Sequence, residues 1–161
     1  MLPHAPQNLI PPVPLYVAAA LAELGVVEDA RPFKSAARIE EYHAATVAGR
    51  ALDDVPWCSS FLCFCFERAG ILSTRSKAAS SWLRWGTSCL PKPFAVCCFP
   101  KSDPDAGGTG HVALSLGLSG STVYVIGGNQ SNRVSIMPRL ARDVISWRAP
   151  DEHFPNPGAL T

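Results

Sequence analysis

The hydrophobic pattern changes near residue 90, and this change constrains the fold most strongly. Before it, apolar residues recur at helical spacing, and glycines end most of the runs. After it, short stretches rich in β-branched and aromatic residues alternate with Gly, Pro, Ser and Asn. This order predicts an α+β fold, with N-terminal helices packed on a C-terminal antiparallel sheet of about five to six strands. The predicted helices span residues 15–24, 35–48, 58–69 and 77–85, and the predicted strands span 94–99, 111–116, 122–126, 134–137 and 144–147.

The length of the chain predicts one domain. A chain of 161 residues can bury a sizeable core and has the usual size of a single domain. Proline gathers at both ends of the sequence. We therefore expect a Pro-rich tail over residues 1–13, a domain over 14–150 and a C-terminal tail over 151–161.

Charge and hydropathy exclude several classes of partner. The formal net charge is +1, so the chain lacks the basic field that binding to nucleic acid or an anionic membrane requires. The longest apolar run, residues 13–24, contains Pro14 and Glu23 and is too short to span a bilayer. No signal peptide is visible. We expect a monomer that is made in the cytoplasm.

Six cysteines leave three uses open: a disulfide framework, a metal site, or buried thiols around one reactive residue. They are Cys58, Cys63, Cys65, Cys89, Cys97 and Cys98. No Cys-x-x-Cys pair occurs, and no histidine lies near enough in sequence to complete a zinc ligand set. The spacing favours the third use, with no metal and no organic cofactor. A redox or metal module is the alternative.

Cys58 is the candidate nucleophile. It follows Pro56 and Trp57 at the first turn of the predicted helix 58–69, where unpaired backbone N–H groups and the helix dipole favour an anion. This position predicts a lowered thiol pKa and a reactive thiolate. The alternative is that Cys58 is one more buried small residue, the commoner role of a free cysteine.

A thiolate nucleophile needs a base, and His111 is the best placed of the four histidines. It opens a predicted strand directly after the Gly-rich segment 107–110, which leaves room beside it. His4 and His153 lie in the tails and His43 lies among polar neighbours, so we expect these three to be solvated. The alternative for His111 is an ordinary surface or core position.

Hairpin geometry indicates Asn129 as the residue that orients His111. A turn centred between the strands 111–116 and 122–126 makes paired residue numbers sum to about 239 or 240. Asn129 would then stand opposite His111, accept its Nδ1–H and leave Nε2 facing the thiol. Gln130 has similar chemistry, but strand alternation predicts that it points to the other face. The alternative for Asn129 is a turn residue after two glycines.

Five motifs form a set whose order along the chain is informative. They are Pro56-Trp57-Cys58-Ser59-Ser60-Phe61, Ala69-Gly70-Ile71, Ala79-Ser80-Ser81-Trp82-Leu83-Arg84-Trp85-Gly86, Gly110-His111-Val112-Ala113 and Gly127-Gly128-Asn129-Gln130-Ser131-Asn132. This set resembles the CHAP and NlpC/P60 peptidoglycan hydrolases, in particular the compact branch of phage endolysins and bacterial antagonism effectors. The resemblance spans residues 14–150 and implies a papain-like fold. It also implies Cys58 as the nucleophile, His111 as the base and Asn129 as the orienting residue.

The resemblance implies cysteine-dependent hydrolysis of an amide bond in bacterial peptidoglycan, by a stem-peptide endopeptidase or an N-acetylmuramoyl-L-alanine amidase. The enzyme would be a cell-wall-lytic effector toxin with a cognate immunity protein, or a phage-type endolysin. It would act in the periplasm or cell wall of the target cell after delivery or lysis. The alternative is a non-catalytic cell-wall-binding module that retains the fold, because the stretch 94–99 departs from the family pattern.

Further residues are candidates for contacts with the substrate. The backbone N–H of Cys58 or Ser59 is the candidate oxyanion donor. The candidates for a groove that binds a peptide or a sugar are Trp57, Trp82, Trp85 and Gln130. For the tryptophans the alternative is a place in the core, because Trp82 and Trp85 share one helical face.

Overall fold

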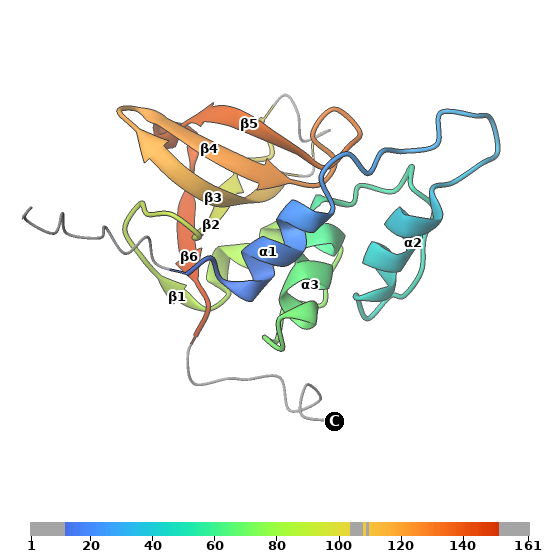
Figure 1. Ribbon diagram of the computed structural model, residues 1–161, viewed down its shortest axis with the longest axis horizontal. Coiled ribbons are helices and arrows are strands. Elements are labelled where there is room, and N and C mark those ends of the chain that lie inside the picture. The colour runs from blue at the N-terminus through green and yellow to red at the C-terminus, as the bar shows by residue number, and fades with distance from the viewer. Residues whose placement is uncertain (1–11, 104–107, 109, 152–161) are drawn as a thin grey trace, which may run out of the picture.

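In a computed structural model, which describes residues 12–103, 108 and 110–151, helices from the first half of the chain lie against a sheet from the second. The fold is α+β, with N-terminal helices packed on a C-terminal six-stranded antiparallel sheet (Figure 1). The predicted fold class is therefore confirmed. Nearly all of the two predicted tails, with His4 and His153, lies outside the described residues.

The helices of the N-terminal half lie within the predicted ranges and are shorter than predicted. They are α1 (Leu15–Ala22), α2 (Ala37–Ala44), α3 (Cys58–Arg68) and the 3-10 helix η1 (Ala79–Arg84). The predicted helix 77–85 thus becomes a single 3-10 segment. At its end the N–H of Trp85 donates to the carbonyl of Trp82, three residues back.

The sheet has the strand order β1-β6-β2-β3-β4-β5, and every neighbouring pair is antiparallel. The strands are β1 (Thr87–Ser88), β2 (Val96–Phe99), β3 (His111–Ser119), β4 (Thr122–Gly127), β5 (Ser135–Leu140) and β6 (Ser146–Ala149). A short 3-10 segment, η3 (Ala141–Asp143), joins the last two strands. Strands β2 to β6 each overlap one of the five predicted strands, although their ends differ from the predicted ones. The two-residue strand β1 was not predicted, because two residues carry no readable periodicity.

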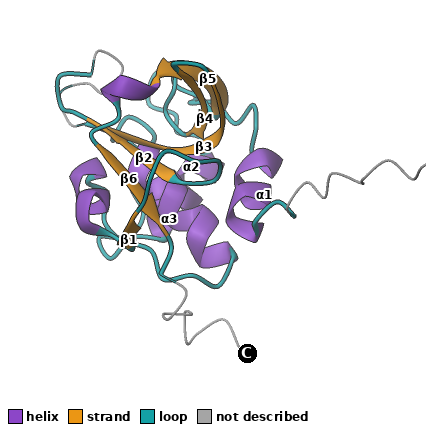
Figure 2. Ribbon diagram, turned by 90° about the vertical axis from the view of Figure 1, so that its left-hand side faces the viewer, coloured by secondary structure: helices purple, strands orange, loops and turns teal. Residues whose placement is uncertain are grey.

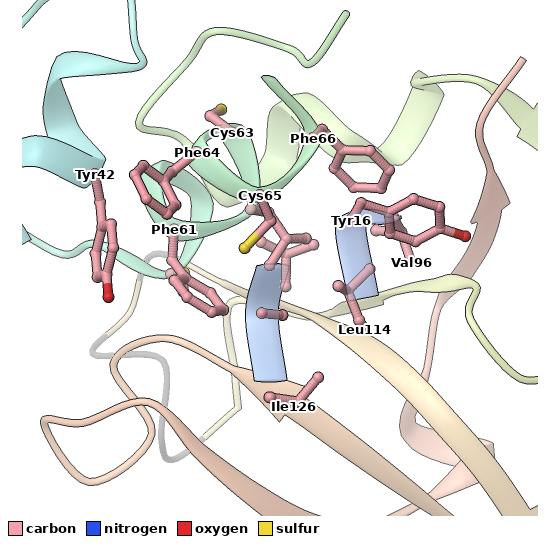
Figure 3. Packing of buried hydrophobic residues seen from close by; sticks show 14 of the residues in the cluster. Tyr16, Tyr42, Phe61, Cys63, Phe64, Cys65, Phe66, Val96, Leu114 and Ile126 are labelled. Carbon is pink, nitrogen blue, oxygen red and sulfur yellow. The ribbon is translucent and has the colours of Figure 1, made fainter. Parts of the chain in front are cut away.

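Helix α3 lies at the centre of the core. Phe61, Cys65 and Phe66 on this helix are buried with Leu114 of β3 and Ile126 of β4 (Figure 3). Figure 2 shows α1 and α3 side by side beneath the strands β3 to β5. Because α3 is enclosed by other helices and by the sheet, every residue from Cys58 to Phe66 is buried, and the helix packs against β3 and β4.

The sheet is covered on both faces at its centre. Cys98 belongs to the buried cluster on the helix side, whereas Cys97 belongs to a second cluster on the opposite face, with Trp147 of β6. The two neighbouring cysteines therefore point to opposite sides, as expected for residues on one strand. Strands β2 and β3 are thus held rigidly from both faces, and β3 carries His111.

Candidate active site

The thiol of Cys58 lies where the first turn of α3 meets the start of β3. Cys58 is the first residue of α3, after Trp57 at the cap position. Its sulfur lies beside the backbone N–H of Val112, the residue that follows His111 in β3. The residue is only 5% exposed. The fold thus brings the predicted nucleophile next to the strand end that carries the predicted base.

Burial dominates the ionisation of this thiol. It raises the pKa of Cys58 to about 11, while the backbone N–H groups of Val112, Ser59 and Cys58 itself act in the opposite direction. The sequence predicts a lowered pKa, and for the resting protein this prediction is wrong. The donors of the helix start are present, but the loss of solvent outweighs them. At neutral pH the side chain of Cys58 is a thiol.

The ring of His111 is held by Gln130, not by Asn129. Its Nε2 lies 3.0 Å from Oε1 of Gln130, and both side chains are buried. The amide nitrogen of Gln130 donates to the carbonyl oxygen of Ser135 at 2.7 Å. Because a carbonyl oxygen only accepts, the amide nitrogen faces Ser135 and the amide oxygen faces the ring.

This chain of hydrogen bonds fixes the tautomer of the neutral His111 ring. The amide oxygen of Gln130 accepts, so Nε2 carries the proton and donates it. In the neutral ring, Nδ1 then carries the basic lone pair. The hairpin pairing predicts the opposite tautomer, with Nδ1–H donating and Nε2 facing the thiol, and the bond from Nε2 to Gln130 contradicts it.

The chain leaves β4 earlier than the predicted pairing of Asn129 with His111 requires. The predicted register holds for Leu114 with Ile126 and for Ser115 with Val125, whereas a bulge after Ser115 shifts the pairs nearer the turn by one residue. However, β4 ends at Gly127, and Asn129 has a left-handed backbone with φ of 57°. The alternation of a strand therefore stops before Gln130, and its predicted orientation toward the other face does not apply.

Two glycines allow this tight turn. A Cβ at Gly127 would lie 2.9 Å from Oε1 of Gln130. A Cβ at Gly128 would lie 2.7 Å from Cβ of Phe61 and 2.7 Å from the ring of Trp57. The first glycine makes space for the amide that holds the histidine, and the second lets the turn pack closely on the start of α3.

A cavity of about 390 Å³ lies beside Cys58. Its lining residues are Val55, Pro56, Cys58, Lys77, Ala78, Ala79, Ser80, Lys101 and Gly108. A smaller cavity of about 80 Å³ shares Ser80 and Lys101 with it. The remaining lining residues of the smaller cavity are Leu83, Phe99, Pro100, Gly110 and Ile145. We refer to the two cavities together as the Cys58 cleft.

The two lysines and the serine of this cleft are not among the residues that the sequence predicts for the site. Lys77 and Lys101 come from segments before η1 and after β2, and no motif connects them. A larger cavity, of about 630 Å³, is lined by Asp103, Arg139 and other residues and does not include Cys58. We therefore place the candidate site at the Cys58 cleft, because this cleft contains the candidate nucleophile.

Three of the predicted groove residues, Trp57, Trp82 and Gln130, belong to the interior framework. Trp57 and Trp82 are 0% exposed, so neither can line a groove. Nε1 of Trp82 donates to Oγ of Ser59 at 2.8 Å, and this hydroxyl donates to the carbonyl of Ser76 at 2.6 Å. Nε1 of Trp57 donates to a carboxylate oxygen at 2.8 Å. The bonds of the two tryptophans position the first turn of α3.

Trp85 is half-buried and lies in another cavity. It lines a space of about 230 Å³ together with Ile71, Leu72 and Gly86, and none of the residues of the Cys58 cleft takes part. Its Nε1 donates to the carbonyl of Leu72 at 3.0 Å. The predicted role of Trp85 beside the nucleophile is therefore not supported by its position.

His43 is buried, contrary to the expectation of a solvated residue. Its Nδ1 lies 2.8 Å from Oγ of Ser60, within the first turn of α3. Burial is the main cause of its lowered pKa. A neutral His43 thus forms part of the packing between α2 and α3.

The six cysteines are free thiols. Within residues 12–103, 108 and 110–151, no group of three or more His, Cys, Asp or Glu side chains is arranged to hold a metal ion. In the same part of the chain, no helix has the length and apolar character needed to cross a membrane.

The fold and the site define an α+β protein with a cysteine, a histidine and a glutamine gathered at one end of its sheet. No family model, curated protein or solved structure matches this chain. Its function is therefore inferred from the residues of the site and from the sequence motifs.

Proposed function

We propose that the protein is a cysteine-dependent hydrolase that cleaves an amide bond in bacterial peptidoglycan. The observation that carries the proposal is the hydrogen-bond chain from Ser135 through Gln130 to His111, at the strand end beside Cys58. Nucleophilic catalysis by cysteine needs a thiol, a base and a group that orients the base. The substrate class is supported by the motifs that resemble CHAP and NlpC/P60 hydrolases.

The proposed reaction begins with a proton transfer. Nδ1 of His111 takes the proton of the Cys58 thiol as the sulfur attacks the carbonyl carbon of the amide. The new S–C bond forms while the π electrons move onto the carbonyl oxygen. Collapse of this intermediate breaks the C–N bond, and the amine leaves with the proton from Nδ1. Water then attacks the thioester, releasing the carboxylic acid and restoring the thiol.

The oxyanion of this intermediate requires donors near the sulfur. The backbone N–H groups of Cys58 and Ser59 point at the sulfur at the start of α3, and both act to lower the pKa of the thiol. They are not needed for helical hydrogen bonds, because they belong to the first turn. We assign them to the developing oxyanion, the role that the sequence predicts for one or other of the same two residues.

The raised pKa of Cys58 determines how the thiol is activated. A thiol with a pKa of about 11 is not an anion at neutral pH, so the proton must leave during the attack. A base with a defined tautomer is then essential, and Gln130 provides this for His111. The mechanism is general-base catalysis rather than attack by a preformed thiolate.

Two reactions are compatible with this site: cleavage within the stem peptide, and cleavage between the stem and the sugar. We propose that the protein acts in the periplasm or cell wall of a target cell, as an effector toxin or an endolysin. An effector would require a cognate immunity protein in the cell that produces it.

A second candidate function is a cell-wall-binding module without catalysis. The observation that favours it is the burial of Cys58, which keeps the thiol protonated and 5% exposed. Under this alternative, the polar contacts of His111 would only stabilise the loop after β4.

Digestion of purified sacculi by wild-type protein and by Cys58→Ala tests the two candidates. We expect wild type to release muropeptides and the variant to release none, because the variant has no nucleophile. The masses of the products identify the bond that is cut. Binding of both proteins to sacculi without any product would support the second candidate and exclude the hydrolase.

A further inference from the structure

We infer that the Cys58 cleft binds a substrate that carries a carboxylate close to the scissile amide. The inference deepens the proposed function and rests on it, because it assigns a substrate chemistry to the same site. It starts from the charges of the cleft: among its described lining residues, two are lysines and none is acidic. The whole chain has a formal net charge of only +1, so this positive character is local.

Lys101 is the more available of the two cations. It is exposed and lines both cavities of the cleft. Within the part of the chain that the structure describes, no acidic side chain forms an ion pair with it. Its ammonium group can therefore pair with an anion of the substrate without displacing an internal partner.

Lys77 is held in place by the protein. Its Nζ donates to Oγ1 of Thr46 at 2.7 Å and to the carbonyl oxygen of Gly49. An ammonium group has three N–H donors, so these two bonds leave one for a ligand. A side chain that is already ordered loses less conformational entropy when it binds an anion.

The arrangement of the two cavities orients the substrate. The larger cavity is lined by Cys58 and both lysines, whereas the smaller one is lined mainly by apolar side chains such as Leu83, Phe99 and Ile145. Lys101 lies at their boundary. In a bound substrate, a carboxylate near Lys101 would thus lie between an apolar group in the smaller cavity and the scissile carbonyl carbon near Cys58. A short acidic peptide with an apolar residue has this pattern.

Alkylation of Cys58 tests this inference independently of catalysis. Iodoacetate and iodoacetamide react in the same way: the thiolate sulfur forms a bond to the CH₂ carbon, and iodide leaves. The two reagents differ in that only iodoacetate carries a carboxylate. The ratio of their rates at one cysteine cancels the thiolate fraction, so it reports the local attraction for an anion. Peptide mapping by mass spectrometry isolates Cys58 from the other five thiols.

The reference for this ratio is a small uncharged thiol, 2-mercaptoethanol, treated with the same two reagents. We expect the ratio of iodoacetate to iodoacetamide rates at Cys58 to exceed the ratio in the reference by about threefold or more. The reason is that unit positive charges in a partly solvated cleft attract the carboxylate of iodoacetate. The variant Lys101→Glu should abolish the preference. The matched control is Lys92→Glu, which makes the same change of net charge at an exposed residue outside the cleft. This control should leave the ratio unchanged.

Equal ratios at Cys58 and in 2-mercaptoethanol, with no effect of Lys101→Glu, would overturn the inference and leave the proposed hydrolase intact. A native Cys58 that reacts with neither reagent would contradict both, because the cleft would not open on the sulfur. Loss of sacculus digestion alone, with the charge preference retained, would reject the proposed function only. The three results are therefore distinguishable.

Discussion

Gln130 determines, as a single residue, which nitrogen of His111 can act as a base. Its amide is oriented by Ser135, and its oxygen accepts the proton of Nε2. Without it, this hydrogen bond no longer holds the proton on Nε2. The role of Gln130 is thus one of positioning, and it can be separated experimentally from the role of its neighbour Asn129.

We predict that Gln130→Ala lowers kcat by about 10- to 100-fold, a part of the usual contribution of a general base. Asn129→Ala is the matched control. It should keep kcat near that of wild type, because the amide that holds the ring belongs to Gln130. Steady-state kinetics on a soluble muropeptide measure both variants. A Gln130→Ala enzyme with normal kcat would show that catalysis does not depend on the amide of Gln130.

A role in stability alone would not alter the pH profile, and this provides a second test. Gln130→Glu places a carboxylate beside Nε2 of His111, which favours the protonated ring. We expect the acidic limb of the kcat profile to move to higher pH in this variant. An unchanged limb would indicate that position 130 acts only on the loop.

Local sequence features are sufficient to propose two of the three residues of the candidate site. Cys58 stands at a helix start and His111 follows a Gly-rich segment. Gln130 is predicted only as a groove residue, and its contact with His111 is missed because strand alternation, when extended past Gly127, places it on the wrong face. Composition carries the signal that corrects this: Gly, Asn and Ser dominate residues 127–132, and such residues favour turns.

At the scale of elements, the contact between the loop after β4 and the start of α3 holds the site together. Gly128 packs against Phe61 and Trp57, where no Cβ fits. This contact joins the strand end that precedes Gln130 to the helix that carries Cys58. Its integrity should therefore affect stability and activity together.

We predict that Gly128→Ala lowers the free energy of unfolding by about 1–3 kcal/mol, the usual cost of an overpacked core. Urea denaturation followed by tryptophan fluorescence measures this change. Ser119→Ala, at the exposed tip of the β3–β4 hairpin, is the control and should change the free energy little. A Gly128→Ala protein as stable as wild type would mean that the loop can move away from α3 without loss.

The elements were easier to predict than their ends. Helix α2 begins at Ala37, two residues after the start of the predicted range 35–48. The Ser35 hydroxyl accepts from the backbone N–H of Asp53 at 3.0 Å. The Asp53 carboxylate in turn accepts the N–H of Ala36 at 2.8 Å. Beyond the end of α2, the N–H of Val47 donates to the carbonyl of Arg75. These partners are distant in sequence, so local patterns cannot reveal where the helix begins and ends.

At the scale of the whole molecule, burial of thiols links folding to pH. Burial raises the pKa of Cys58 to about 11 and of Cys98 to about 12, and it also raises the pKa values of Cys63, Cys65 and Cys97. In the unfolded chain these thiols ionise near their ordinary pKa of 9.0. Above that pH, the unfolded state binds fewer protons than the folded state, so stability falls as pH rises.

We predict that the urea midpoint, measured in the presence of a reductant, stays constant from about pH 7 to 8 and declines from about pH 9 upward. The decline follows because each buried thiol loses its proton more readily in the unfolded chain than in the folded one. Cys97→Ala lowers the midpoint at neutral pH because it leaves a cavity. Its decline at high pH should nevertheless be shallower than that of wild type. A midpoint that does not change up to about pH 10 would contradict the burial of these thiols.

The central claim is that Cys58 forms a thioester with the substrate. Rapid acid quenching during turnover, followed by intact-protein mass spectrometry and peptide mapping, tests it directly. We expect an acyl adduct on the peptide that contains Cys58 in the wild-type protein, and no adduct in Cys58→Ala, which also releases no product. Product release by Cys58→Ala at the wild-type rate would contradict a thioester at Cys58.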